Sequence, residues 1–348
     1  MPERSGKAAR IRLDFCRVNA RTVTLLDVAR AAGVSKSTAS DALQGSGRVA
    51  GTTRDRVREV ADRLGYRPNS AARRLRRAST GAVGLHLPQT ATRLDYYMNL
   101  AFGAVSRAQE EGLDVVLLAP SSGTCGRLAS RVDGLLVIDP EVGDTAVPAL
   151  LESGVPVVTG ERYLGPVPAP VGSVVCDNAA SLNALLDHVL DRGARRPALL
   201  APADASAWAA ALRTTAESWS RARSAPVTVR TVSFAATARE AEEATLALLA
   251  EDPLTDAVIC APDGAAPGVL HAAGALGRVV GTDLLVASCV DGPAARGGNP
   301  PITAIDLRPA AYGRACAELL CDVLAGRAAP DTVRRHEWGL ETRASTLG

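Results

Sequence analysis

Beyond Gly81 the chain repeats one pattern, a short and continuously apolar run followed by a stretch whose apolar residues recur at helical spacing. Continuous apolar runs are typical of parallel strands that are buried on both faces of a sheet. We expect helices between the strands, as at residues 179–192 and 238–251. The alternation predicts an α/β region with two doubly wound parallel sheets. The expected strands are residues 82–88, 113–120, 132–139, 155–160, 196–202, 227–234, 256–263 and 283–290.

Upstream of this region the period changes to that of short helices. Thr24 and Asp27 are placed as a variant capping box, in which each side chain accepts a hydrogen bond from the other residue's backbone N–H. A first helix is therefore expected at about residues 25–32. Gly33 can adopt a left-handed conformation after it, and Ser35 can serve as the N-cap of a second helix. So short a turn forces the two helices to cross steeply, as in a helix-turn-helix.

The apolar positions of these helices fit one shared core, and the positions spaced to face it are Leu25, Val28, Val34, Ala39 and Leu43. A third helix is expected at about residues 52–64, with apolar positions Val57, Val60, Ala61 and Leu64. The polar side chains left outside are Lys36, Ser37, Ser40 and Asp41. An ordinary helical hairpin has the same periodicity. The A-x-x-x-G-V-S turn, the polar outer face and the local charge together favour DNA binding.

The net charge of +2 conceals a strong asymmetry along the chain. Residues 1–80 contain 18 Lys and Arg against 7 Asp and Glu, whereas residues 81–348 contain 21 against 30. A basic module joined to an acidic one indicates that nucleic-acid contact is confined to the N-terminal part. A soluble basic tail would give the same totals, so charge alone does not separate the two interpretations.

The segment GYRPNSAARRLRRAST connects the two regions. Pro68 ends the third helix, and Asn69 can cap a short helix at residues 70–77 that contains four arginines and the apolar Leu75. A helix of this length is unstable alone in water, so it would form only against a partner. Basic side chains around one large apolar residue suit the minor groove of DNA, where leucine can insert between base steps. A flexible basic linker is the alternative.

Several other classes of protein lack their sequence signatures here. The seven cysteines include no C-x-x-C pair, and the four histidines are isolated from one another, so no metal site is indicated. No dinucleotide, phosphate-loop or serine-hydrolase motif follows a predicted strand. No apolar run is long enough to span a membrane, and residues 1–20 lack the apolar core of a signal peptide. We therefore expect a cytoplasmic protein without a cofactor or catalytic activity.

The segments TLLDVARAAGVSKSTAS and RVREVADRLGYRPNSAARRLRRASTGAVGL together resemble the N-terminus of the lactose-repressor (LacI) family of bacterial transcription regulators almost position by position. The resemblance implies that Lys36, Ser37 and Asp41 face base edges in the major groove, and that Leu75 enters the minor groove. It also implies that Ser35, Thr38 and Thr53 contact phosphates. The full set of expected DNA-binding residues is Thr24, Ser35, Lys36, Ser37, Thr38, Asp41, Arg48, Thr53, Asn69, Ala72, Arg73 and Leu75.

Two residues of the headpiece depart from the family's pattern. Asp41 stands where relatives most often have arginine, which can make a bidentate contact to guanine that an acid cannot make. Asp41 can accept a hydrogen bond from cytosine, or it can pair with Arg48 and hold that arginine to the DNA. Ala50 stands where relatives often have a serine N-cap, so the third helix is expected to lack a cap unless Thr52 or Thr53 compensates.

A weaker resemblance covers the α/β region, on the segments VDGLLVID, VVCDNAASLNALLDHVLDRGARRPALLA, DAVICAPDGAA and PPITAIDLRP. It implies the periplasmic-binding-protein fold, in which two lobes close on a small molecule. Clefts in such folds form at the carboxyl ends of strands. For Asp177 and Arg213 a salt bridge remains the alternative, and for Tyr97 and Phe234 core packing does. The implied effector-binding residues are Tyr97, Asp177, Arg213, Phe234 and Asp263.

Two residues of the expected effector site make a free sugar a less suitable effector. Sugar-binding relatives tend to have Asn-Asp where this chain has Pro262-Asp263, and an acid where it has Val290. Buried sugar hydroxyls would lose hydrogen-bond partners at both places. A less polar metabolite, a modified glycoside or no effector at all therefore remain open.

Together these patterns predict a homodimeric repressor of transcription that binds operator DNA and responds to a small molecule. The alternative is a solute-binding protein or a sugar-processing enzyme with an incidental basic N-terminus. The predicted domains are a basic extension at residues 1–21, a helix-turn-helix headpiece at 22–67, a hinge helix and linker at 68–80, and a two-lobed effector-binding and dimerisation domain at 81–348.

Overall fold

The computed structural model describes residues 23–44, 49–67, 79–89, 94–118, 128, 130–166, 169–203 and 205–347. They belong to two compact units, which divide between Arg77 and Ala78. The predicted basic extension and hinge helix lie outside the described residues. In the part of the chain that the structure describes, no helix is long and apolar enough to cross a membrane.

The first unit contains the three predicted helices, α1 (Leu25–Ala31), α2 (Lys36–Gln44) and α3 (Gly51–Arg63). Thr24 and Asp27 form the capping box, and Gly33 has the predicted positive φ of +63°. A single core joins all three helices, with Val28, Ala39 and Val57 fully buried in it. Leu25, Val34 and Leu43 are half-buried against this core, as the spacing predicted.

Two details of the predicted headpiece were wrong. Ser40 was expected on the outer face of α2, but its small side chain is buried, with 8% exposed. Leu64 was expected in the core, but it follows the last turn of α3 and is 37% exposed. Ala61 of the same helix, in place of Leu64, is buried in the core.

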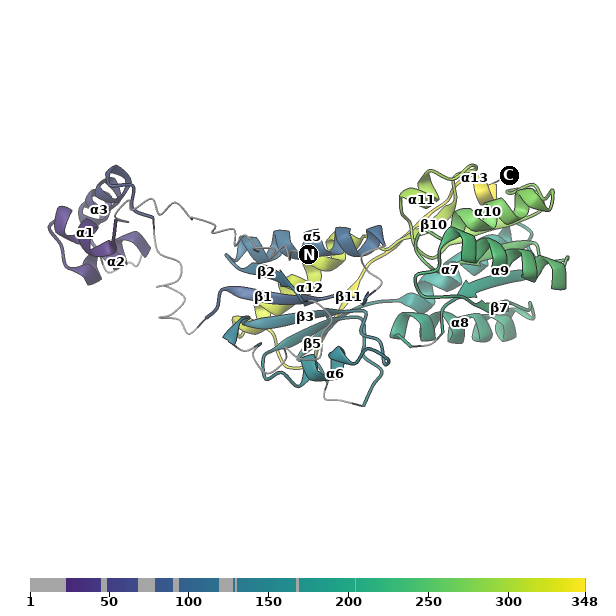
Figure 1. Cartoon of the computed structure of the whole chain (residues 1–348), viewed down its shortest axis with the longest axis horizontal. Helices are drawn as coiled ribbons and strands as arrows, with labels where there is room; N and C mark the ends of the chain where they lie inside the picture. The colour runs from purple at the N-terminus through teal and green to yellow at the C-terminus, as the bar shows by residue number, and fades with distance from the viewer. Residues whose placement is uncertain are drawn as a thin grey trace, which may run out of the picture. The chain divides into compact units, whose positions relative to one another are not determined.

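The second unit contains two lobes, each built on a six-stranded sheet (Figure 1). We call the one that includes the first strand of the unit the N-lobe. Its sheet has the order β11-β5-β4-β3-β1-β2, with neighbouring strands parallel. The strands are β1 (Ala82–His86), β2 (Asp114–Leu117), β3 (Gly134–Ile138), β4 (Val157–Gly160), β5 (Gly172–Cys176) and β11 (Thr332–His336).

Helices cover both faces of the N-lobe sheet. α5 (Asp95–Glu110) and α12 (Pro309–Leu324) pack together on one face, and α6 (Ala146–Leu151) packs on the other. α5 and α12 approach closely because each has a glycine at the crossing, Gly103 and Gly313. A Cβ atom at either glycine would lie 1.9 Å from a backbone oxygen of the other helix.

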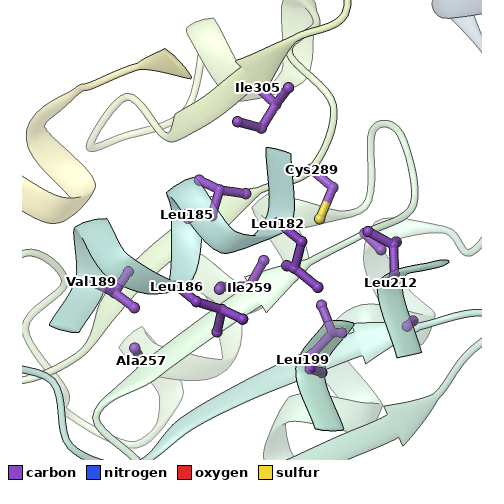
Figure 2. Packing of buried hydrophobic residues seen from close by; sticks show 14 of the residues in the cluster. Leu182, Leu185, Leu186, Val189, Leu199, Leu212, Ala257, Ile259, Cys289 and Ile305 are labelled. Atoms are coloured by element: carbon purple, nitrogen blue, oxygen red, sulfur yellow. The ribbon is translucent and has the colours of Figure 1, made fainter. Parts of the chain in front are cut away.

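The other lobe, the C-lobe, has the strand order β12-β10-β9-β8-β6-β7, and only β12 is antiparallel to its neighbour. Helices α7 and α8 cover one face, and α9 and α10 cover the other, while α11 and α13 are short helices of the same lobe. Figure 2 shows Leu182, Leu185, Leu186 and Val189 of α7 packed against Ile259 and other apolar residues of the sheet. The elements are β6 (Pro197–Ala201), β7 (Thr228–Thr231), β8 (Ala257–Cys260), β9 (Leu285–Ser288), β10 (Thr303–Asp306), β12 (Gly339–Glu341), α7 (Asn178–Asp191), α8 (Ala207–Arg223), α9 (Ala238–Glu251), α10 (Ala266–Ala275), α11 (Pro293–Arg296) and α13 (Ala344–Leu347).

All eight predicted strands are present, each within one predicted run, so the two doubly wound sheets are confirmed. Four strands were not predicted: β5, β10, β11 and β12. β11 has the sequence TVRRH and lies at the edge of its sheet, where one side faces solvent and polar residues are tolerated. β12 has only three residues, too few to show a period.

Three segments connect the lobes. They lie between β5 and α7, between β10 and α12, and between β11 and β12, so each lobe contains residues from distant parts of the chain. The connections follow the carboxyl ends of β5 and β10, where α/β folds bind ligands.

Candidate functional site

The N-terminal turn of α2 combines exposed polar side chains with a well-formed cap. Ser35 Oγ accepts a hydrogen bond from Thr38 N at 3.0 Å and lies 2.8 Å from both Ser37 Oγ and Thr38 Oγ1. Lys36 and Ser37 are exposed at this helix start, and Asp41 is half-buried one turn later. A helix N-terminus with an exposed lysine is suited to an anionic partner.

The remaining predicted DNA-binding residues fall into two groups. Thr24 is exposed, and its hydroxyl donates to Asp27 Oδ2 at 2.7 Å within the capping box, while Thr53 is half-buried in the first turn of α3. The others lie outside the described residues, namely Arg48, Asn69, Ala72, Arg73 and Leu75.

Helix α3 begins without a side-chain cap. Its N-cap is Ala50, whose φ and ψ of −56° and 143° are those of an ordinary extended residue. Replacing Ala50 with serine is expected to stabilise the headpiece by about 1 kcal/mol, because its hydroxyl can accept from a free N–H in the first turn. Thermal unfolding of the full chain would measure this, and an Ala50→Gly variant, which adds no acceptor, should gain less. A serine variant no more stable than wild type would contradict the prediction.

A cavity of about 480 Å³, including the part open to solvent, lies between the lobes. Its lining residues follow strands of both sheets, lie at the starts of α5 and α8, or belong to the connecting segments, as expected for a ligand site in this class of fold. The described residues that line it are Leu94, Tyr96, Tyr97, Asp139, Glu161, Cys176, Asn178, Trp208, Phe234, Asp263, Val290 and Leu307.

Asp139 is the first of three carboxyl groups in this cavity. It follows β3 with φ +44°, a left-handed conformation that residues other than glycine rarely adopt, and its Oδ2 accepts from the Tyr97 hydroxyl at 2.7 Å. Burial, followed by repulsion from Glu161, raises the pKa of Asp139 to about 7. A buried acid of this kind in a cleft is typical of a functional site.

Glu161 and Asp263 are the other two carboxyl groups. Glu161 follows β4 with φ +70°, and its Oε1 accepts from Cys176 N at 2.9 Å. Asp263 follows β8, and its Oδ2 accepts from Tyr96 N in the opposite lobe at 3.3 Å. Burial raises the pKa of both groups above the ordinary range of carboxyl groups, although the hydrogen bonds that each accepts act in the opposite direction.

Four aromatic rings line the same cavity. Tyr96 and Tyr97 come from the start of α5, with ring centroids 5.1 Å apart, and Trp208 and Phe234 face each other from the C-lobe at 5.8 Å. Both pairs are arranged edge to face. The cavity is therefore lined by aromatic residues from both lobes and by carboxyl groups.

Three of the five predicted effector-binding residues line the cavity, and two do not. Tyr97, Phe234 and Asp263 line the cavity, although Tyr97 is also part of the N-lobe core. Asp177 does not line it, because its Oδ1 caps α7 by accepting from Ala180 N and its Oδ2 lies 3.6 Å from Arg335. Arg213 does not line it either.

The guanidinium of Arg213 is bound within its own lobe. Its Nε donates to Pro202 O at 2.6 Å, and its Nη2 donates to Thr231 Oγ1 at 2.6 Å. These partners hold the side chain at the ends of β6 and β7 and away from the cavity lining.

Sequence reasoning missed Asp139, Glu161, Asn178 and Trp208 as candidates. A signal existed for the two acids, since each directly follows a continuously apolar run, in VDGLLVID and VPVVTGE. The predicted strand 132–139 placed Asp139 inside the strand, whereas β3 ends at Ile138 and leaves the acid at the carboxyl edge. Among the described residues, no group of three His, Cys, Asp or Glu side chains is arranged to hold a metal ion.

Comparison with known proteins gives matches over nearly the whole chain. The family model "Bacterial regulatory proteins, lacI family" matches residues 24–69, and "Periplasmic binding protein-like domain" matches residues 186–346. The HTH-type transcriptional regulator CelR of Thermobifida fusca is 32% identical over 317 residues, which cover 88% of this chain and 93% of CelR. The HTH-type transcriptional regulator reg1 of Streptomyces lividans is 30% identical over 330 residues, covering 89% and 92%.

Solved structures of two transcription regulators also match most of this chain. A complex of the transcriptional regulator CelR with cellobiose superimposes with a TM-score of 0.68 at 28% identity, covering 93% of this chain and 99% of that one. The lac repressor dimer bound to operator and the anti-inducer ONPF superimposes with a TM-score of 0.76 at 25% identity, covering 94% and 100%.

Proposed function

The chain belongs to the lacI family of bacterial regulatory proteins and is a DNA-binding transcription regulator, and we propose that it acts as a homodimeric repressor. In this proposal each headpiece binds half of an operator, and a small molecule in the cavity between the lobes changes the affinity for that operator. The protein would act in the cytoplasm, where the chromosome lies, and would catalyse no reaction.

The exposed start of α2 is the observation that best supports the mode of DNA binding. We assign base contacts to Lys36, Ser37 and Asp41, and phosphate contacts to Ser35 and Thr38, whose hydroxyls lie at the helix N-terminus. Phosphate contacts position a recognition helix, and base contacts give it specificity. Thr24, Arg48 and Thr53 complete the proposed contacts of the headpiece.

The segment at residues 70–77 is proposed to form a hinge helix on DNA. Its arginines would lie along the minor groove, with Leu75 inserted between base steps and Asn69, Ala72 and Arg73 beside the backbone. A Leu75→Ala variant is then expected to bind operator more weakly and to bend it less, as measured by gel mobility of DNA with the operator at its centre. Unchanged bending would remove the hinge from the proposal.

Dimer formation is supported by exposed apolar residues on the N-lobe. Met98 and Phe102 lie one turn apart on α5 and are 49% and 69% exposed, and Leu117 of β2 is 64% exposed. Monomeric proteins rarely expose apolar surface in clusters. The lac repressor relative was solved as a dimer, and we propose that this surface is the dimer interface here.

The proposed effector site is the cavity between the lobes, and its proposed contacts are Tyr97, Phe234 and Asp263 together with Asp139 and Glu161. We do not extend the proposal to Asp177 and Arg213. The CelR relative was solved with cellobiose, which makes cellobiose the first compound to test. A ligand that binds one arrangement of the lobes better than another shifts the population between them, and the operator affinity with it.

Selection of bound sequences from random DNA by the full chain tests this function directly. We expect one roughly palindromic operator to be enriched, and its affinity to fall by about 10³-fold between roughly 50 and 200 mM salt, because Lys and Arg displace counterions from several phosphates. A solute-binding protein or sugar-processing enzyme would enrich no sequence. That outcome would refute the proposal.

A further inference from the structure

The cavity between the lobes is acidic and has no basic side chain in its described lining. Asp139, Glu161 and Asp263 line it, while none of the twelve described lining residues is Lys, Arg or His. These three carboxyl groups form no ion pair with any described basic side chain, and their hydrogen bonds are to neutral groups. Burial of a carboxylate without a counter-ion is costly, which is why the pKa values of these groups are raised, and a cation bound among them would favour their charged forms.

Some of the hydrogen-bond donors around the cavity are occupied by these same carboxyl groups. The Tyr97 hydroxyl donates to Asp139, Tyr96 N donates to Asp263, and Cys176 N donates to Glu161. The Asn178 side chain also hydrogen-bonds Glu161. Each carboxyl group keeps further lone pairs that can accept hydrogen bonds, which suits a ligand that supplies donors.

The aromatic rings favour the same kind of ligand. Tyr96 and Tyr97 belong to the N-lobe and Trp208 and Phe234 to the C-lobe, and all four line the cavity together with the acids. Aromatic rings attract a cation within about 6 Å of the ring centroid, and tryptophan does so most strongly. Aromatic surface next to carboxylates is thus complementary to an organic cation with some apolar surface.

From these contacts we infer that the effector contains a positively charged nitrogen, as in an amino-substituted saccharide, which binds to Asp139, Glu161 and Asp263 between the aromatic rings. An ammonium group has three N–H donors and no acceptor, so it matches a lining rich in acceptors. The inference rests on the proposed function of the cavity as the effector site and specifies the chemistry of that effector.

A neutral saccharide fits this lining less well. A sugar hydroxyl is neutral, so its hydrogen bonds to the carboxyl groups are weaker than those of a cationic N–H donor. A neutral ligand would also leave the three carboxyl groups uncompensated in a site that it shields from water. Both effects disfavour a plain disaccharide relative to its amino derivative.

The experiment compares two disaccharides that have the same β-1,4 linkage: cellobiose and the corresponding disaccharide of glucosamine, which replaces two hydroxyls with ammonium groups. Isothermal titration calorimetry of the full chain at one pH and ionic strength gives both affinities. We expect the diamine to bind at least about tenfold more tightly, because charge-assisted hydrogen bonds are stronger than neutral ones. Equal affinities, tighter binding of cellobiose, or binding of neither would overturn the inference.

Variants locate the effect in the cavity. Asp139→Asn keeps the shape of the side chain and removes a buried charge, so it is expected to fold, and it should reduce the affinity for the diamine by about tenfold while changing that for cellobiose much less. Glu141→Gln is the matched control. Glu141 lies two residues after Asp139, but its side chain does not line the cavity. This variant should prefer the diamine over cellobiose as strongly as the wild type does. An Asp139→Asn protein that retains the full preference contradicts the assignment.

Operator binding by the same preparation tests the proposed DNA-binding function separately from the inferred charge of the effector. A protein that selects an operator but prefers cellobiose, or binds neither disaccharide, refutes the cationic effector and leaves the DNA-binding function intact. A protein that prefers the diamine but selects no DNA sequence supports the charge of the ligand and refutes the proposed repressor.

Discussion

Replacing Gly313 with alanine is expected to destabilise the N-lobe by about 3 kcal/mol or more, the upper end of what overpacking costs. The added Cβ would lie 1.9 Å from Leu100 O and 3.1 Å from Ala104 N, both backbone atoms of α5. Backbone atoms cannot rotate away as the end of a side chain can, so α5 and α12 would have to separate. Their shared core, which includes Tyr97, Leu100 and Tyr312, would then open.

Differential scanning calorimetry of the full chain measures the change in thermal stability. Gly274→Ala is the matched control, because Gly274 lies in α10 with no heavy atom within 4 Å of the position of a Cβ. The control is expected to stabilise the protein by about 0.5–1 kcal/mol, since alanine is the better helix former. A Gly313→Ala protein that unfolds at the wild-type temperature would show that the crossing can relax. Gly103→Ala should behave as Gly313→Ala does, since its Cβ would lie 1.9 Å from Ala310 O.

Replacing Asp41 with arginine is expected to change which operator the protein prefers. Asp41 lies on α2 in the second turn after the exposed Lys36 and Ser37. An acid can accept a hydrogen bond from cytosine N4–H₂, whereas arginine binds guanine O6 and N7. At the operator position that this residue contacts, we expect the preferred base to change and the new base to be favoured by about tenfold or more.

Selection from random DNA at one salt concentration, performed with both proteins, measures this preference. Asp62→Arg is the control, because Asp62 is exposed on α3 and the substitution makes the same change in charge. The control should tighten binding to all sequences without altering the selected one, since added positive charge acts mainly through phosphates. If Asp41→Arg merely tightens binding to every sequence in the same way, the role of Asp41 in base recognition is wrong.

The headpiece shows how much local sequence can predict. Thr24 and Asp27 form the predicted capping box, Ser35 caps α2, and Gly33 has the left-handed conformation expected of it. These features depend on residues that are at most three or four positions apart, so the interactions that stabilise them are local in the sequence. Ser40 was misplaced because its burial depends on how closely α2 packs into the shared core of the unit.

The lining of the cavity could be predicted only in part from local sequence. Tyr97, Phe234 and Asp263 were found through the family resemblance and line the cavity, whereas Asp177 and Arg213 have other partners. Asp139 and Glu161 were missed, although the apolar runs before them were recognised as strands. Whether an acid after a strand faces a cavity or solvent depends on the lobe opposite, which is far away in sequence.

The helix-turn-helix, the eight strands with continuous apolar runs and the separation of a basic module from an acidic one could all be predicted from the amino-acid sequence. Each of these follows from periodicity, capping or charge within a short window. Which strands are edges, how closely α5 and α12 cross, and which carboxyl groups share the cavity depend on contacts between distant segments and follow from the folded structure. Three connections bring residues such as Asp139, Phe234 and Leu307 together from distant parts of the chain. The burial that raises the pKa of Asp139 is therefore a property of the assembled lobes, and no segment of the sequence contains it.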